Sequence, residues 1–391
     1  MKDAGLFPLP SAELLDGLAA MQRSLAKAYP LKTKHRAVLP GVIRQLSDYL
    51  TVNREDLPRD YMSRPDFLGA YLNYYLPWNI YRQGRLLMGL DLCLQPGARV
   101  VDLGAGPLTF LQALWLSRPG LRDQDLDYLA VDRSETALKT GRKLFAAMAA
   151  GSQWQIRTDN QPVGQNRFKP ADLLVMANFV NELDRAPRAG RAVEGASREE
   201  QLLERWEVQV APAGAILLIE PGVRDAGRFL SRIREAALIR GWSIPAPCPH
   251  SGDCPMPGLR STPWCHFTFP TGDTPAWLSR LSDKAKLPKA RASLSFLLLV
   301  RGEDPPVRIR PAKSPGRGAG VVRVISEGFD LPNGKIGRYG CAEKGLILLE
   351  NPRSEWGPAP GCEVTVGWPE KPRKDRKSGG LIVPLGPGRT R

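Results

Sequence analysis

The sequence predicts an α/β fold built on a largely parallel sheet with helices on both faces. From about residue 97 to 300, short β-branched or leucine-rich runs alternate with helical segments, and a glycine-rich turn follows the first run. Such alternation is typical of doubly wound sheets, because parallel strands need helical crossovers. A chain of 391 residues with 42% hydrophobic residues can form two or three domains with a buried core.

The predicted strands are short apolar runs between amphipathic helices. Strands are expected at ARVVDLG, LDYLAVD, QWQIRTD, ADLLVMANF, AILLIEP and SLSFLLLV. Helices are expected at ETALKTGRKLFAAMAA, REEQLLERWEVQV and AGRFLSRIREAALIRG, where apolar residues recur at helical spacing. The sequence therefore predicts a domain at residues 93–302, with a Cys-rich insertion at 246–270.

Two regions flank this domain. Residues 1–92 are predicted to be helical, with Ser11 as an N-cap; their aromatic stretch favours packing on the next domain over nucleic-acid binding. Residues 303–320 are rich in Pro, Gly and basic residues, which is typical of a linker. The runs VVRVIS, KIGRYG, GLILLE, EVTVGW and GLIVPL then predict a small β-barrel, OB-like or SH3-like, at residues 321–391.

The glycine-rich turn after the first predicted strand is a candidate cofactor site. Its members are Gly104, Ala105, Gly106 and Pro107. Small residues let a backbone approach a ligand, and the following helix offers free N–H groups. Two details favour S-adenosylmethionine over a dinucleotide. Asp102 resembles the acidic residue that ends the first strand of class I methyltransferases, and Thr109 stands where G-x-G-x-x-G needs its third glycine.

Polar residues follow the next three predicted strands. Asp132 lies at the distance expected for a carboxylate that binds ribose hydroxyls. Asp159 is placed to contact the adenine amine, and Asn178 to face the methyl-transfer site; a capping or surface role is the alternative for both. No catalytic residue is assigned, because the fourth strand lacks Asn-Pro-Pro-Tyr, and the two possible bases, Glu182 and Glu220, could equally be structural.

Three cysteines lie within 18 residues in the stretch PAPCPHSGDCPMPGLRSTPWCHF: Cys248, Cys254 and Cys265. Their C-x5-C-x10-C spacing is not that of a zinc ribbon. Prolines after the first two keep the loop extended, as in some iron–sulfur loops. We expect Cys341, in the turn RYGCAEKG, to be the fourth ligand.

The identity of the metal is left open by the spacing. An iron–sulfur cluster is favoured over zinc, and the zinc alternative is a Cys3His site completed by His250 or His266. Six cysteines in a protein expected to stay reduced indicate metal binding or catalysis rather than disulfides.

The charge of the chain predicts a polyanionic partner. The net charge is +15 and the pI about 9.7. The last 91 residues hold 17 Lys and Arg against 10 Asp and Glu, a surplus of seven. Such surfaces bind phosphate backbones by releasing counterions, although a generally basic protein is the alternative. No apolar run reaches the roughly 20 residues that span a bilayer, and the first residues lack signal and transit patterns. A cytoplasmic protein without a membrane partner is expected.

Several motifs together carry a family resemblance. Asp102-Leu-Gly-Ala-Gly-Pro, then CPH, CP and WCHF, and then a late lone cysteine, resemble the methyltransferase-like proteins of the mitochondrial small ribosomal subunit and their bacterial relatives. The resemblance covers about residues 60–350. It implies a class I methyltransferase fold, a [4Fe-4S] cluster on the four cysteines, and S-adenosylmethionine at the glycine turn and its two aspartates. It also implies binding to small-subunit ribosomal RNA during assembly.

These observations give one leading hypothesis and two rivals. The leading hypothesis is a small-ribosomal-subunit assembly or translation factor that binds rRNA, contains a [4Fe-4S] cluster and is monomeric off the ribosome. The rivals are an active S-adenosylmethionine-dependent rRNA methyltransferase with a structural cluster or zinc site, and a protein or small-molecule methyltransferase. The missing transit pattern favours a bacterial cytoplasm, whereas a eukaryotic source would imply the mitochondrial matrix.

Overall fold

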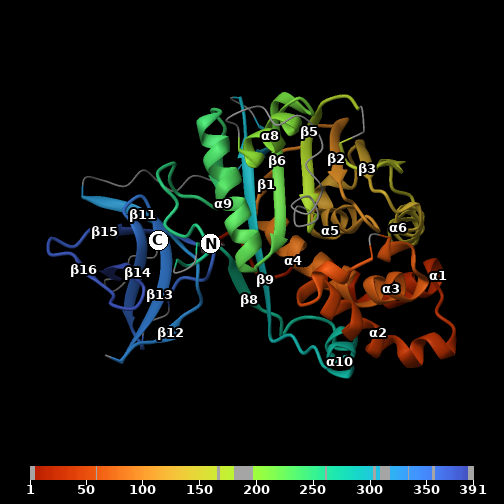
Figure 1. Cartoon of the computed structure of the whole chain (residues 1–391), viewed down its shortest axis with the longest axis horizontal. Helices are drawn as coiled ribbons and strands as arrows, with labels where there is room; N and C mark the ends of the chain where they lie inside the picture. Colours follow the sequence, from red (N-terminus) through yellow and green to blue (C-terminus); the bar gives the residue numbers. More distant parts are fainter. Residues whose placement is uncertain are drawn as a thin grey trace.

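The structure of the chain is a computed structural model that describes residues 5–58, 60–164, 168–179, 197–259, 262–302, 305–308, 318–332, 334–354 and 357–385. It contains a large central sheet, helices packed on that sheet, and a second sheet near the C-terminus (Figure 1). Helix α9 (Arg224–Ile239) lies between the large sheet and the C-terminal strands (Figure 1).

The large sheet has the order β4-β3-β2-β5-β6-β9-β7, with β8 paired to β9. Its strands are β2 (Ala98–Leu103), β3 (Leu126–Val131), β4 (Gln155–Asp159), β5 (Ala171–Ala177), β6 (Val210–Pro221), β7 (Ser243–Ala246), β8 (Phe267–Pro270) and β9 (Arg291–Val300). Strands β2 to β6 pair in parallel, as predicted, and β9 is antiparallel to both neighbours. The first five strands follow the doubly wound order 3-2-1-4-5. With the antiparallel strand inserted before the last one, this is the class I methyltransferase fold.

The large sheet is buried on both faces. In β5, Leu173 and Val175 point into one hydrophobic core, while the alternate residues Leu174 and Met176 point into the other. Side chains alternate along a strand, so both sets must be apolar when helices cover both faces. One core includes residues of α1 (Ala12–Ala28), α4 (Leu76–Gly89), α5 (Thr109–Ser117) and α6 (Glu135–Met148). The other includes residues of α8 (Arg198–Glu207) and α9.

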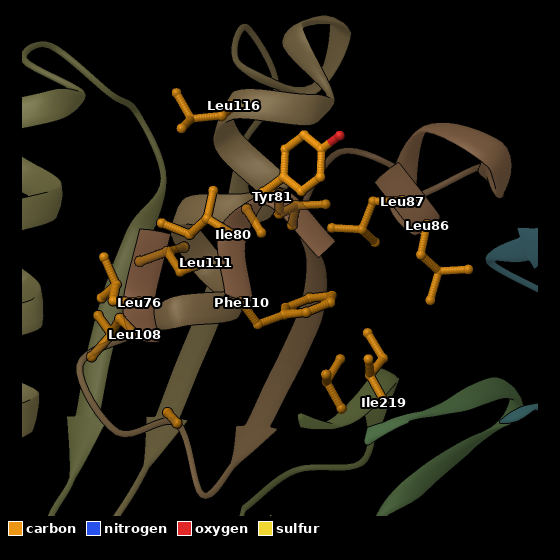
Figure 2. Close-up of a cluster of buried hydrophobic side chains, with 14 of the residues drawn as sticks. Leu76, Ile80, Tyr81, Leu86, Leu87, Leu108, Phe110, Leu111, Leu116 and Ile219 are labelled. Carbon is orange, nitrogen blue, oxygen red and sulfur yellow. The ribbon is translucent and has the colours of Figure 1, made fainter. Parts of the chain in front are cut away.

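The N-terminal region is helical and packs on the sheet. Its elements are α1 (Ala12–Ala28), α2 (Thr33–Thr51), α3 (Pro65–Ala70), the π-helical turn η3 (Tyr71–Tyr75) and α4 (Leu76–Gly89). Ser11 caps α1 by accepting the Leu14 N–H at 3.3 Å, as predicted. Most rings of the aromatic stretch are buried, and Tyr71 and Tyr75 are half-buried, which confirms the packing hypothesis. Leu76 and Ile80 of α4 contact the helix that carries Leu111, and Tyr81 is fully buried (Figure 2).

The second sheet is formed by β11 to β17, called here the C-terminal sheet. Its strands are β11 (Ala319–Val324), β12 (Phe329–Asp330), β13 (Lys335–Ala342), β14 (Gly345–Pro352), β15 (Glu363–Gly367), β16 (Arg373–Lys374) and β17 (Leu381–Pro384). The five predicted strands are all present. The order is β15-β11-β13-β14-β17-β16, with β12 paired to β13, and Val322, Ile347 and Leu349 lie in a core of its own. Among the described residues this sheet is open, because its two end strands, β15 and β16, do not pair with each other.

The N-terminal segment joins the two sheets. The Leu6 N–H donates to the Gly361 carbonyl at 3.2 Å, on the side of the C-terminal sheet. Phe7 stacks on Phe269 of β8 at 5.3 Å between ring centroids, and its carbonyl accepts a hydrogen bond from Arg85 of α4. Two further features are the short antiparallel pair β1 (Asp91–Leu92) and β10 (Val307–Arg308), and helix α10 (Ala276–Lys284), which packs near α2. The C-terminal sheet is therefore packed against the large sheet through buried contacts.

Candidate functional site

A cavity of about 460 Å³ opens at the carboxyl edge of the parallel strands, and we call it the glycine-turn cavity. Four predicted cofactor residues line it: Gly104, Gly106, Asp132 and Asn178. They follow β2, β3 and β5, whose carboxyl ends meet at one edge because the strands are parallel. The remaining lining residues are Asp60, Tyr61, Met62, Ser63, Tyr71, Arg133, Ser134, Pro162, Val163, Ala177 and Phe179.

The glycines of the turn are required by its backbone and by a close neighbour. Gly104 has φ +74° and Gly106 has φ +52°, both in the left-handed region that glycine adopts easily. A Cβ atom at Gly104 would lie 2.2 Å from a ring carbon of Phe179. The missing side chain therefore lets Phe179 lie against the turn and form one wall of the cavity.

Asp132 holds the turn and faces the cavity. One carboxylate oxygen accepts the Gly106 N–H at 2.8 Å, and the other accepts the Ser134 N–H at 2.8 Å. Burial raises the pKa of Asp132, although these two N–H groups act in the opposite direction. The carboxylate is thus fixed in position beside the cavity, where it can accept hydrogen bonds from ligand hydroxyls.

The other predicted cofactor residues, all of them described, lie outside the lining of this cavity. They are Asp102, Ala105, Pro107, Thr109 and Asp159. Asp102 is 1% exposed and accepts the Tyr128 hydroxyl at 2.7 Å, beneath the turn. Burial raises the pKa of Asp102 to about 7, with the hydroxyl of Tyr128 opposing that rise. Asp159 contributes its main-chain carbonyl to the Asp132 N–H at 3.2 Å, so its strand does end beside the site.

The cavity has a cover that the sequence did not predict. Asp60 and the 3-10 turn η2 (Tyr61–Ser63) lie ahead of α3, and Tyr71 comes from the π-helical turn. In the sequence, a polar segment just before Pro65 indicates a loop in front of a helix. Nothing in that signal shows which part of the distant sheet the loop will face. Phe179 was missed for the same reason.

The four predicted metal ligands line a second, small cavity of about 30 Å³, called here the cysteine cavity. Cys248, Cys254 and Cys265 come from the loop between β7 and β8, and Cys341 comes from β13 of the C-terminal sheet. Much of the remaining lining is apolar, including Phe296, Leu297 and Ile325. The structure thus brings together cysteines that are up to 93 positions apart in the sequence.

Among the cysteines of this cavity, Cys341 is buried and Cys248, Cys254 and Cys265 are half-buried. Burial raises the pKa of Cys248, Cys265 and Cys341, and the neighbouring sulfurs add to this effect. His250 also lines the cavity, with Nε2 3.3 Å from the Cys341 Sγ. His266 instead stacks on Trp264 and is not among the lining residues. Among the described residues, no three His, Cys, Asp or Glu side chains converge closely enough to hold a single metal ion.

One family model matches this chain, and its description is mitochondrial small ribosomal subunit Rsm22. The match spans residues 95–324, more than half of the 391. The chain belongs to the Rsm22 family. The Rsm22 match contains the large sheet, the glycine turn and the first three cysteines, and it ends before Cys341. The expected family is therefore confirmed. No curated protein sequence matches the chain significantly.

Solved structures similar to this Rsm22 family member include several methyltransferases. A methyltransferase from Pyrococcus furiosus is 13% identical, with 54% of this chain and 78% of that chain covered and a TM-score of 0.31. A SAM-dependent methyltransferase from Thiobacillus denitrificans, in complex with S-adenosyl-L-homocysteine, is 12% identical, with 58% and 92% covered and a TM-score of 0.31. Magnesium protoporphyrin IX methyltransferase from Synechocystis, with the same ligand, is 12% identical, with 67% and 100% covered and a TM-score of 0.33. The assignment of the fold rests on strand order rather than on these scores.

Two further predicted features concern catalysis and membranes. Glu220, at the end of β6, is 1% exposed and interacts electrostatically with Arg82. Glu182 lies outside the described residues.

Among the helices that the structure describes, none is long and apolar enough to cross a bilayer.

The buried Asp102 carboxyl generates a prediction about pH. Its folded-state pKa of about 7 lies above the usual 3.8, so the folded protein binds this proton more tightly than the unfolded chain. The stability that Asp102 contributes is present below pH 4 and is lost as the pH rises to about 7. Asp102→Asn should therefore raise the free energy of unfolding at pH 8 by at most about 4 kcal/mol, and much less at pH 4.5.

Urea denaturation of the two proteins at both pH values measures this difference. Asp123→Asn is the matched control, because Asp123 is exposed. An equal effect of Asp102→Asn at both pH values would contradict the prediction.

Proposed function

We propose that this Rsm22 family member is an S-adenosylmethionine-binding factor of the small ribosomal subunit that contacts ribosomal RNA and holds a [4Fe-4S] cluster. The observation that carries the proposal is the cysteine cavity, which is lined by three thiols from the loop between β7 and β8 and one from β13, in a chain that also has a methyltransferase-type cofactor cavity. Family membership supports the ribosomal setting, because the family is named for the mitochondrial small ribosomal subunit.

The donor set of the cysteine cavity fits an iron–sulfur cluster. Four cysteine thiolates are the usual ligands of a [4Fe-4S] group, and each binds a different iron. Cys248, Cys254, Cys265 and Cys341 would hold it, and it would supply an anionic, redox-active centre. The largely apolar lining would limit access of water. Burial raises the pKa of Cys248 and Cys341, so binding a cluster through their thiolates should release protons and stabilise the fold.

Loss of one proposed ligand should be visible in composition and stability. Anaerobically purified protein should contain iron and acid-labile sulfide, and Cys254→Ser should lose both and unfold at a lower temperature. The measurements are a visible spectrum, iron and sulfide assays, and a thermal melt. Cys93→Ser is the control, since Cys93 is not among the residues lining the cavity. Stoichiometric zinc without iron in the wild type would replace the cluster by the zinc alternative.

The glycine-turn cavity is the proposed S-adenosylmethionine site. Its volume is within the range of small-molecule pockets, about 300–1,000 Å³. Gly104 and Gly106 let the backbone approach the ligand, and Asp132 would accept the ribose hydroxyls. Asn178, with φ +58° at the end of β5, lies on the cavity wall near the expected methyl-transfer position.

Removing the charge at Asp132 should weaken cofactor binding. A charge-assisted hydrogen bond contributes about 1.5–3 kcal/mol, so Asp132→Asn should raise the dissociation constant for S-adenosylmethionine about tenfold or more. Isothermal titration calorimetry measures this change, with the exposed Asp123→Asn as control. Unchanged affinity in Asp132→Asn would mean that the ribose lies elsewhere.

The proposed RNA contact includes the basic loop between β15 and β17. Arg373, Lys374, Arg376 and Lys377 are all exposed there. Exposed cations on a small β-domain can follow a phosphate backbone. The basic linker that precedes this domain in the sequence lies mostly outside the described residues, so the loop carries the structural argument.

Charge reversal in this loop tests the RNA contact. Replacing the four cations by Glu should weaken binding to a small-subunit rRNA fragment and flatten its salt dependence, because each lost phosphate contact removes about 0.7–0.9 from the log–log slope. S-adenosylmethionine binding should not change. The control makes the same charge change at four exposed cations of the N-terminal region: Lys32, Lys34, Arg36 and Arg44. Wild-type affinity and salt slope in the loop variant would rule out this contact.

Active methyl transfer to rRNA is the second candidate function. The open glycine-turn cavity favours it, since a protein that only needed the fold for assembly could have filled this space. Transfer of label from S-adenosyl-L-[methyl-³H]methionine to small-subunit rRNA would support this activity. Tight RNA binding without transfer would leave the assembly role.

A further inference from the structure

Arg234 is a buried cation beside the cysteine cavity. It projects from α9, is 5% exposed and lines the cavity. Its Nε donates to the Cys248 Sγ at 3.1 Å. Its Nη2 donates to the carbonyl oxygens of His250 at 2.9 Å and Gly252 at 2.7 Å. One side chain therefore contacts the loop at its first cysteine and at two carbonyls that follow it.

The charge of Arg234 has no carboxylate partner in the described part of the chain, where no Asp or Glu lies within 4.0 Å of its guanidinium. A buried charge is costly unless an opposite charge balances it. The hydrogen bonds of Arg234 instead go to the Cys248 sulfur and to two carbonyl oxygens of the same loop. A thiolate or another anionic group in the cysteine cavity is therefore placed to balance the charge of Arg234.

A second buried arginine, Arg323, differs from Arg234 because it has a carboxylate partner. Arg323 of β11 is 2% exposed, donates to the Pro247 carbonyl at 3.1 Å and is paired in the register with Cys341. Its guanidinium also forms an ion pair with Glu363. The charge of Arg323 is thus balanced by a carboxylate within the C-terminal sheet, whereas that of Arg234 is not. Of these two arginines, only Arg234 bonds directly to a cavity sulfur.

We propose that Arg234 is a positioning residue of the cysteine cavity, which orders the loop at residues 248–252 and supplies the positive charge that balances the anionic group held by the thiolates. This inference rests on the proposed function for the nature of that group, but the ordering of the loop follows from the contacts alone. Hydrogen bonds to the sulfurs and nearby charge set the reduction potential of an iron–sulfur cluster. A cation that donates to Cys248 stabilises the more negative, reduced state and so raises the potential.

Three variants separate charge from contact. Arg234→Met keeps much of the volume and removes both charge and hydrogen bonds, whereas Arg234→Lys keeps the charge but cannot make all three contacts. Arg232→Met is the matched control: Arg232 is on the same helix but pairs with Glu199 of α8. Arg232→Met therefore makes the same substitution on α9 at a residue that does not line the cysteine cavity.

The first measurement is hydrogen exchange of the loop in the purified full-length chain, whatever metal it contains. Arg234→Met and Arg234→Lys should both increase exchange at residues 248–256 at least tenfold, and Arg232→Met should not. Unchanged exchange in both Arg234 variants would overturn the inference. This result does not depend on the cluster, so a wild type without iron would remove the proposed cluster and still leave Arg234 tested.

The second measurement is the midpoint potential of the iron-containing protein, titrated with dithionite and followed by its visible and paramagnetic resonance spectra. Arg234→Met should favour the oxidised state at least tenfold relative to the wild type, a fall of about 59 mV for one electron. Arg234→Lys should remain closer to the wild type because it keeps the charge, and Arg232→Met should match the wild type. A potential in Arg234→Met equal to that of the wild type would overturn the charge-balancing role.

Discussion

The parallel sheet that is buried on both faces is the constraint on which the rest of the structure depends. Parallel strands must return through helical crossovers, so their carboxyl ends meet at a single edge. The turns after β2, β3 and β5 therefore converge, and the glycine-turn cavity forms there. Apolar residues on both sides of each strand follow from the same constraint, because helices cover both faces. Leu173 and Leu174, adjacent in β5, lie in different cores for this reason.

The cysteine cavity forms where this sheet meets the C-terminal sheet. Ile325 and Cys341 extend the core of the large sheet into the C-terminal strands, and Leu6 and Phe7 pack across the same junction. Arg323 connects the two sides by its bond to the Pro247 carbonyl. A group bound by all four thiols would join the loop and β13 covalently and add its binding energy to that of the packed junction. The cysteine cavity is therefore both a candidate binding site and part of the interface between the two sheets.

The two cavities use buried charge in different ways. At the glycine turn, Asp132 is held by two main-chain N–H groups, while Asp102 lies deeper with one hydroxyl donor. Among the described residues that line the cysteine cavity, Arg234 is a buried cation without a carboxylate partner, and its guanidinium suits an anionic occupant. If the thiols were neutral, a buried Arg234 without a carboxylate partner would lower the stability of the fold. The charged groups near each cavity suit the proposed ligands, because Asp132 can accept hydrogen bonds from hydroxyl groups and Arg234 can donate to a thiolate.

The sequence by itself determined the alternating strands, the glycine turn, the three-cysteine loop and the family, because these depend on local periodicity and spacing. Only the tertiary structure decided which of those residues meet. Asp102 and Asp132 both end strands, yet Asp102 points beneath the turn and Asp132 toward the cavity. The cover of Tyr61 and Tyr71, the wall of Phe179 and the contact of Arg234 with Cys248 join segments far apart in the chain. Packing between such segments leaves no periodic pattern in the sequence, so it could not be predicted from spacing alone.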